Sequence, residues 1–210
     1  MVKPISQTME EIEKSTENKI LEAAKDEFIA RGFDGARMQK IAERAEINKA
    51  LLHYYFRNKE NLFKAVFGNV FGDFFPGIMK SFLSDLPFTE KLRLFINGYL
   101  DVLNANPKLP AFILHEVQHR PELLLDSISS LGIKPQMIAG ILENELKKEK
   151  LKPIPVPHLI INILSMCIFP IVASPIMAAV FYEGDQKKYL SFLDERKEII
   201  YQFVVNALKS

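Results

Sequence analysis

The chain has 210 residues, a formal net charge of +1 and 48% hydrophobic residues, a composition that excludes disorder over most of its length. This length allows one large domain or a small module joined to a larger one, and the near neutrality excludes a polycation. The single cysteine, Cys167, excludes an intramolecular disulfide and a zinc cluster built on cysteines. Because it fits a reducing compartment and the acidic, polar N-terminal stretch lacks an apolar signal region, we expect a cytoplasmic protein.

Apolar residues recur with helical period almost everywhere after a polar stretch at residues 1–15, which is expected to be a flexible tail. Gly32 is a residue type that is common just past a helix end, and Asn48 and Asn58 are each placed to cap the helix that follows. Pro76 is expected to end or kink the last helix of this part. Four helices are therefore predicted here, at about residues 16–31, 38–45, 49–55 and 59–75.

The rest of the chain is also helical by period, and no sustained alternation of apolar and polar residues argues for a strand. Prolines such as Pro107 and Pro121 mark helix ends, and a short helical piece can follow as far as Ser130. Five further helices are predicted, at about residues 88–106, 111–120, 137–148, 153–182 and 185–209. The sequence thus predicts an all-α chain of nine helices, in which three short helices form a compact unit that the fourth joins to a larger body.

The stretch at 153–182 contains no Asp, Glu, Lys or Arg and is long enough to cross a bilayer. Its internal prolines, Pro170 and Pro175, and the polar Asn162 fit a membrane span poorly. A helix that is buried on all sides in a soluble protein is equally apolar. We therefore favour a buried helix over a membrane-tethered protein and expect no membrane partner.

Residues 38–55 fit a helix-turn-helix, because two short helices with apolar inner faces are joined by a tight turn at Glu46-Ile47. The outer face of the second of these helices can enter a major groove. There Lys49 can reach a phosphate or a guanine edge, and the small Ala50 permits close approach. The rings of His53 and Tyr54 can donate to phosphates, and Leu51 can pack on a thymine methyl group.

Local charge also favours binding of nucleic acid by this region. Residues 36–64 carry seven basic and three acidic side chains, a local charge of +4 in a chain that is otherwise near neutral. Phosphate binding needs such a patch and does not need a high overall charge.

Three sequence elements occur in order here: Ile-Ala-x-x-Ala at 41–45, Tyr-x-Phe at 54–56 and Asn-Lys-Glu-x-Leu at 58–62. With these elements, the chain resembles the tetracycline-repressor (TetR) family of bacterial transcriptional regulators. The resemblance implies an all-α fold with a helix-turn-helix DNA-binding domain at 16–67 and a divergent ligand-binding and dimerisation domain at 68–210.

The same resemblance implies a homodimer, formed through the last two helices, that binds a pseudo-palindromic operator in double-stranded DNA. A small apolar or amphipathic effector would release the DNA, so the implied function is that of a ligand-responsive repressor, activators being a minority in the family. Met38, Glu46, Ala50 and His53 depart from the family pattern, so the operator sequence is not implied. The implied DNA contacts are Gln39, Lys40, Asn48, Lys49, Ala50, Leu51, His53, Tyr54 and Lys59, the last of which would meet the DNA backbone.

Two features of the larger domain are candidates for effector response. Phe67 and Phe71 alternate with Gly68 and Gly72, a pattern that fits either a core stripe or a hinge at which the helix tilts. The expected effector pocket is lined by aromatic, sulfur-containing and imidazole side chains. The candidates are Phe82, Phe95, Tyr99, Phe112, His115, His119, Met137, Met166 and Cys167.

Residues 115–119 read His-Glu-x-x-His, the pattern of zinc metallopeptidases, in which a helix places both imidazoles on one face. Pro121 ends this helix, and no third ligand follows at a suitable spacing. An enzyme built on this helix is the rival of the regulator, and we predict no enzymatic activity, no catalytic residue, no cofactor and no metal. Two alternatives stay open for these residues: they line a pocket that binds a polar ligand or a metal, or they are ordinary polar side chains at the surface or at an interface.

Overall fold

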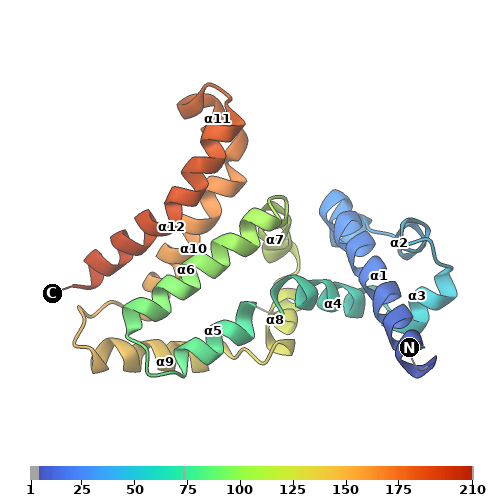
Figure 1. Cartoon of the computed structure of the whole chain (residues 1–210), viewed down its shortest axis with the longest axis horizontal. Helices are drawn as coiled ribbons and strands as arrows, with labels where there is room; N and C mark the ends of the chain where they lie inside the picture. Colours follow the sequence, from blue (N-terminus) through green and yellow to red (C-terminus); the bar gives the residue numbers. More distant parts are fainter. Residues whose placement is uncertain (1–4, 73, 210) are drawn as a thin grey trace. The chain divides into compact units, whose positions relative to one another are not determined.

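The computed structural model describes residues 5–72 and 74–209 of the chain. Every regular element in these residues is an α-helix, which confirms the predicted all-α fold class. The described residues form twelve helices rather than the predicted nine. They are α1 (Ile5–Gly35), α2 (Met38–Arg44), α3 (Lys49–Phe56), α4 (Lys59–Phe71), α5 (Phe74–Phe82), α6 (Phe88–Ala105), α7 (Leu109–His119), α8 (Pro121–Ser130), α9 (Pro135–Lys148), α10 (Val156–Val172), α11 (Ser174–Tyr182) and α12 (Gln186–Leu208) (Figure 1). Of the three helices beyond the nine, α8 is the short helical piece expected as far as Ser130, whereas α5 and α11 come from breaks inside two predicted helices or just after them.

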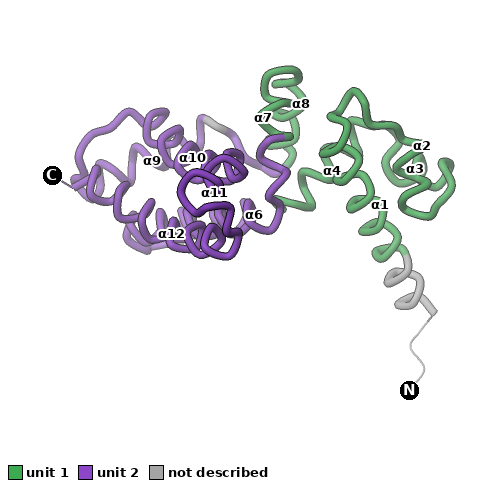
Figure 2. The backbone as a smooth tube through the Cα atoms, turned by 90° about the horizontal axis from the view of Figure 1, so that it is seen from above, with its two compact units in different colours: residues 1–72, 112–130 green, residues 73–111, 131–210 purple. Residues whose placement is uncertain are grey.

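The chain forms two compact units (Figure 2). Unit 1 comprises Met1–Gly72 and Phe112–Ser130, and unit 2 comprises Asp73–Ala111 and Leu131–Ser210. This division differs from a single boundary near residue 67, because most of α7 and all of α8 pack with the N-terminal helices. Periodicity along the chain predicts a helix there but does not show which unit its apolar face joins.

Unit 1 is built around an aromatic core on the inner faces of α1 and α4. Phe28 is fully buried, and its ring centroid lies 5.9 Å from that of Phe33, 5.4 Å from Phe63 and 6.5 Å from Phe112. Helix α1 packs on α2 and α4, and α4 packs on α8. Aromatic residues from three separate helices, α1, α4 and α7, therefore share one core in unit 1.

Helix α1 begins at Ile5, so the predicted start near residue 16 is too late. Residues 5–15 are rich in Glu and contain neither Gly nor Pro, a composition that permits a helix to continue. The first four residues of the predicted tail lie outside the described residues, and the mobility of this stretch stays a prediction. At the other end, Gly32 has a φ of 68° and interrupts α1 at the expected position.

The break after α4 falls at Gly72 rather than at Pro76. Pro76 is the third residue of α5, a position whose N–H has no partner within the helix, so proline is tolerated there. A side-chain carbon added at Gly72 would lie 2.3 Å from the carbonyl oxygen of Gly68, so glycine is needed for this backbone path. The hinge at this position stays a prediction.

Unit 2 is arranged around α6, which packs on α5, α10 and α12. One side of α6 is buried over its whole length, by Phe88, Leu92, Ile96, Leu100 and Leu103. Lys91 lies among them with 1% of its surface exposed, and its Nζ is 2.8 Å from Oε2 of Glu145. This ion pair joins α6 to α9 inside the unit.

The apolar stretch at 153–182, predicted as one helix, is two helices, α10 and α11, bent by 75° at their junction. Pro175 lies in the first turn of α11 and cannot donate a backbone hydrogen bond, so the α10 ladder ends at Ala173. Within the described residues, none of the individual helices is both long and apolar enough to span a membrane, and this bent pair passes that test only when taken together.

Candidate nucleic-acid interface

The turn between α2 and α3 places one residue in an unusual backbone conformation. Glu46 has a φ of 58°, in the left-handed region that favours glycine. The N–H of Ile47 donates to the carbonyl oxygen of Ala42 at 3.0 Å and closes the turn. The structure thus explains why glycine is usual here in the resembling family, since a side chain in this conformation costs about 1 kcal/mol.

Helix α3 begins at a cap that the sequence predicted. Oδ1 of Asn48 accepts a hydrogen bond from the N–H of Leu51 at 2.8 Å. Leu52 and Phe56 are buried on the inner face, which fixes the rotation of α3 about its axis. Asn58 caps α4 in the same way through the N–H of Asn61, also at 2.8 Å.

The opposite face of α3 is open. Tyr54 has 78% of its surface exposed, and Leu51 is half-buried at the edge of the face. His53 is oriented by a contact of 2.8 Å between its Nδ1 and the carbonyl oxygen of Arg57. Because that oxygen only accepts, Nδ1 carries the proton, and the Nε2 of a neutral His53 can accept a hydrogen bond but cannot donate one to a phosphate. The exposed residues of this face are Lys49, Ala50, His53 and Tyr54.

The predicted contacts on α2 are held by a neighbour on the same helix. Nζ of Lys40 lies 2.7 Å from Glu43, and Nε2 of Gln39 donates to the same carboxylate at 3.2 Å. These hydrogen bonds, that of Lys40 foremost, lower the pKa of Glu43. All three side chains are exposed, so both donors stay within reach of a ligand.

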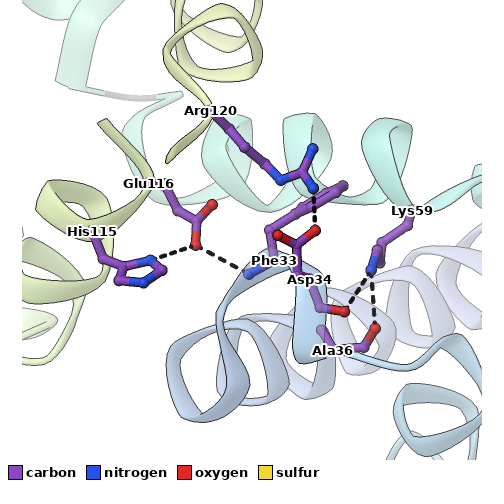
Figure 3. A network of polar contacts seen from close by, with 7 residues as sticks. All are labelled: Phe33, Asp34, Ala36, Lys59, His115, Glu116 and Arg120. Atoms are coloured by element: carbon purple, nitrogen blue, oxygen red, sulfur yellow. Dashed lines mark hydrogen bonds and ion pairs between the residues drawn. The ribbon is translucent and has the colours of Figure 1, made fainter. Parts of the chain in front are cut away.

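Lys59, predicted to meet the DNA backbone, is bound to the end of α1. Its Nζ donates to the carbonyl oxygens of Asp34 at 3.3 Å and Ala36 at 3.2 Å, and lies 4.6 Å from the ring centroid of Phe33 (Figure 3). The ammonium therefore joins the first turn of α4 to the segment that precedes α2. Its contact with DNA stays a prediction.

A second set of polar contacts holds α7 against the same segment (Figure 3). Oε1 of Glu116 accepts a hydrogen bond from the N–H of Phe33 at 3.1 Å. Arg120 forms an ion pair with Asp34, and its guanidinium lies 4.8 Å from the centroid of the Phe33 ring. Phe33 and Asp34 lie between Gly32 and α2, so these contacts hold the segment that leads into the helix-turn-helix.

The residues of the His-Glu-x-x-His pattern are held by contacts within the protein. Glu116 is 2% exposed, and its Oε1 is engaged by the N–H of Phe33 and by Nδ1 of His115, each at 3.1 Å. Within the described part of the chain, no group of three or more His, Cys, Asp or Glu side chains could hold a metal ion. Glu116 therefore joins α7 to the end of α1 within unit 1.

The predicted effector-pocket residues fall in both units. Phe112 is part of the aromatic core of unit 1, and His115 and His119 lie on the same helix. In unit 2, Phe95 and Tyr99 stack with their centroids 5.8 Å apart. The remaining four are also in unit 2, where Phe82 and Met166 are partly buried, Cys167 is buried and Met137 is exposed. The pocket itself stays a prediction.

The Tyr99 neighbourhood in unit 2 contains groups that periodicity alone did not single out. The ring of Phe74 lies 5.7 Å from Phe95 and 5.8 Å from Tyr99, so three aromatic rings meet. Burial raises the pKa of Tyr99, and burial also raises the pKa of Cys167 to about 12. Arg196 donates to the carbonyl oxygen of Met166 at 3.0 Å, and among the described residues its buried Nε has no hydrogen-bond partner. A charged residue within an apolar helical face was the only signal of Arg196 in the sequence.

The fold and this exposed, basic helix-turn-helix define the class of a DNA-binding transcriptional regulator. Residues 20–66 match the family model described as bacterial regulatory proteins, tetR family. The chain is 34% identical over 149 residues to the HTH-type transcriptional regulator RutR of Escherichia coli O157:H7, covering 69% of this chain and 68% of that protein. The chain therefore belongs to the TetR family.

Two further relatives extend this comparison. The HTH-type transcriptional repressor NicS of Pseudomonas putida (strain KT2440) is 27% identical over 162 residues, which cover 73% of this chain and 74% of NicS. The crystal structure of the transcriptional regulator FadR from Bacillus subtilis in complex with stearoyl-CoA matches with a TM-score of 0.65 at 19% identity, covering 90% of this chain and 98% of FadR. At that identity, the FadR likeness shows the fold alone.

Proposed function

We propose that the protein is a homodimeric repressor that binds a pseudo-palindromic operator and is released from it by a small apolar or amphipathic effector, acting in the cytoplasm. The observation that supports DNA binding is the orientation of the capped helix α3. This helix buries Leu52 and Phe56 on one face, and Lys49, His53 and Tyr54 are exposed on the other. Repression is supported by the relative NicS, which is described as a transcriptional repressor. Binding of an effector is supported by FadR, whose crystal structure contains stearoyl-CoA.

Within the proposed DNA site, α3 supplies the central contacts. Lys49 is exposed at the first turn of α3, and no ion pair of its ammonium is found in the described residues, so it is available to a phosphate or to a guanine edge. Gln39, Lys40, Asn48, Ala50 and Leu51 flank it, and Lys59 completes the proposed set. Asn48 serves first as a cap, so its DNA contact would use the side-chain NH₂ group that the cap leaves over.

Replacing Lys49 by alanine is expected to weaken operator binding about tenfold at physiological salt. The slope of log K against log salt should also become shallower by about one for each protomer, because one phosphate contact is lost. The measurement is a titration of a fluorescent duplex, selected from a random library with the wild-type protein, at several salt concentrations.

The matched control for this prediction is Lys108→Ala, which removes an exposed lysine from unit 2. It should leave both the affinity and the salt slope unchanged. Failure of the wild-type protein to enrich any duplex, or equal behaviour of the two variants, would contradict the proposed reading site.

The proposed homodimer rests on apolar side chains that unit 2 leaves exposed. Helix α10 packs on α12, and each presents two large exposed apolar residues, eight positions apart on α10 and four apart on α12, spacings that place each pair on one face of its helix. Exposed apolar patches of this kind mark interaction surfaces. The residues are Ile161 and Phe169 on α10 and Ile199 and Phe203 on α12.

Replacing Phe203, which is 66% exposed, by glutamate is expected to convert the dimer to a monomer without loss of helix content. Operator affinity should fall at least about a hundredfold, because the two half-sites would no longer be bound by one linked particle. Light scattering after size exclusion gives the oligomeric state, and the duplex titration gives the affinity. Leu83→Glu, at an equally exposed position away from α10 and α12, should remain dimeric; loss of the dimer in both variants would refute this interface.

A further inference from the structure

Two histidines one turn apart on α7 stand side by side at the surface. The ring centroids of His115 and His119 are 4.2 Å apart, and the ring planes are inclined by only 17°. Both side chains are exposed, so solvent and small ions reach them. An arrangement of this kind brings two imidazoles close enough to share one ligand.

Their hydrogen bonds fix which nitrogen of each ring is free. Nδ1 of His119 lies 2.8 Å from the carbonyl oxygen of His115, and Nδ1 of His115 lies 3.1 Å from Oε1 of Glu116. A carbonyl and a carboxylate oxygen only accept, so Nδ1 carries the proton in both rings. The lone pair of each neutral imidazole is therefore on Nε2, which is the state that binds a metal ion.

Glu116 supplies the partner that metal-binding histidines usually have. A ligating imidazole generally donates its other N–H to a carboxylate or a backbone carbonyl, which fixes the ring and makes it a stronger ligand. Here His115 has the carboxylate and His119 has the carbonyl. The carboxylate is itself held in place by the N–H of Phe33 at 3.1 Å (Figure 3).

We propose that His115 and His119 form a two-histidine site for a divalent transition-metal ion, with water in the remaining coordination positions. Among such ions, nitrogen ligands bind Cu²⁺ most tightly. A metal–nitrogen distance of about 2.0–2.1 Å requires both Nε2 atoms to approach one ion, so the two exposed rings must tilt toward each other at Nε2 while each Nδ1 stays beside its acceptor. No third protein ligand is available within the described residues, so the site is open and exchangeable.

The position of this site links metal binding to unit 1, which contains the helix-turn-helix. The carboxylate that would share the charge of a metal-bound His115 is the same one that binds the amide of Phe33, just before α2. An ion that binds only the folded unit stabilises it by mass action. Metal binding is thus expected to raise the melting temperature of the protein.

The test is a titration of the full-length protein with Cu²⁺, followed by electron paramagnetic resonance and by calorimetry. The wild-type protein should bind about one equivalent with the signature of two nitrogen ligands. His115→Gln and His119→Gln should each weaken binding at least about tenfold, and Glu116→Gln, which keeps an acceptor for Phe33, should weaken it about 10–100-fold.

His158→Gln is the matched control, because it removes an exposed histidine from α10 in unit 2 and should bind Cu²⁺ as the wild type does. A rise of the melting temperature with Zn²⁺ in the wild type, absent from His119→Gln, is a second readout that does not depend on DNA. Undetectable Cu²⁺ binding, unchanged binding in both histidine variants of α7, or equal loss in His158→Gln would each overturn the site.

Discussion

Replacing Phe112 by alanine is expected to destabilise unit 1 by about 3–5 kcal/mol, the cost of removing a large aromatic side chain from a packed core. Phe112 is 8% exposed, and its ring centroid lies 6.5 Å from that of Phe28 and 5.9 Å from that of Phe63. Because both partners are buried and held on α1 and α4, the core cannot close over the space without displacing these helices.

Urea unfolding at fixed protein concentration measures this loss, with circular dichroism as the signal. Leu125→Ala, which truncates an exposed side chain on the adjacent α8, should change the free energy of unfolding by less than about 0.5 kcal/mol. Operator binding by Phe112→Ala should fall with the population of folded unit 1. Phe112 was predicted from the sequence to line an effector pocket, and a variant with normal stability and an altered effector response would favour that prediction.

The helix-turn-helix could be predicted almost to the residue, because its signals are local. The cap at Asn48, the tight turn at Glu46 and the apolar inner face of α3 all lie within a few residues of each other. The outward face of α3 followed from the same spacing, since helix geometry fixes which side chains are opposite the buried ones.

The contacts that hold α7 against the end of α1 could not be predicted, because the residues that form them are far apart in the sequence. Glu116 and Phe33 are 83 positions apart, and nothing in the spacing of either segment indicates that one amide will meet one carboxylate. The His-Glu-x-x-His pattern gives no indication that its glutamate is buried. Only the tertiary structure shows that its carboxylate faces the end of α1.

The break between α10 and α11 shows a third kind of limit. Pro170 and Pro175 both lie inside the apolar stretch at 153–182, yet only the second coincides with a change of helix. Pro170 stays inside α10, and its carbonyl oxygen accepts a hydrogen bond from the hydroxyl of the buried Tyr189. Tertiary contacts of this kind decide which proline ends a helix, and a single sequence does not contain them.

Replacing Lys91 by methionine is expected to destabilise unit 2 by about 3–5 kcal/mol, because one partner of a buried ion pair is removed. Methionine keeps most of the length of the apolar stem, so the loss comes mainly from polar groups. Glu145, whose side chain is 12% exposed, would be left without its cation, and the carbonyl oxygen of Phe82 would lose the donor that now lies 3.2 Å away.

Two comparisons separate this effect from ordinary surface electrostatics. Lys197→Met makes the same substitution in the ion pair with Asp101, which is 62% exposed, and should cost less than about 1 kcal/mol. The double variant Lys91→Met/Glu145→Leu should regain most of the loss, since replacing both partners leaves no buried charge unpaired. Both are measured by urea unfolding at fixed protein concentration.

The double variant also separates two roles that the buried pair can have in unit 2, stability and the positioning of α6. Lys91 and Glu145 join α6 to α9, and the carboxylate of Glu149, just past the end of α9, accepts a hydrogen bond from the N–H of Phe88 at 2.6 Å, so polar contacts help to hold the first turn of α6. If the double variant is stable but no longer responds to effector, the pair fixes the position of α6 rather than its stability. If instead Lys91→Met alone is as stable as the wild type, the pair is not desolvated and the expected loss is wrong.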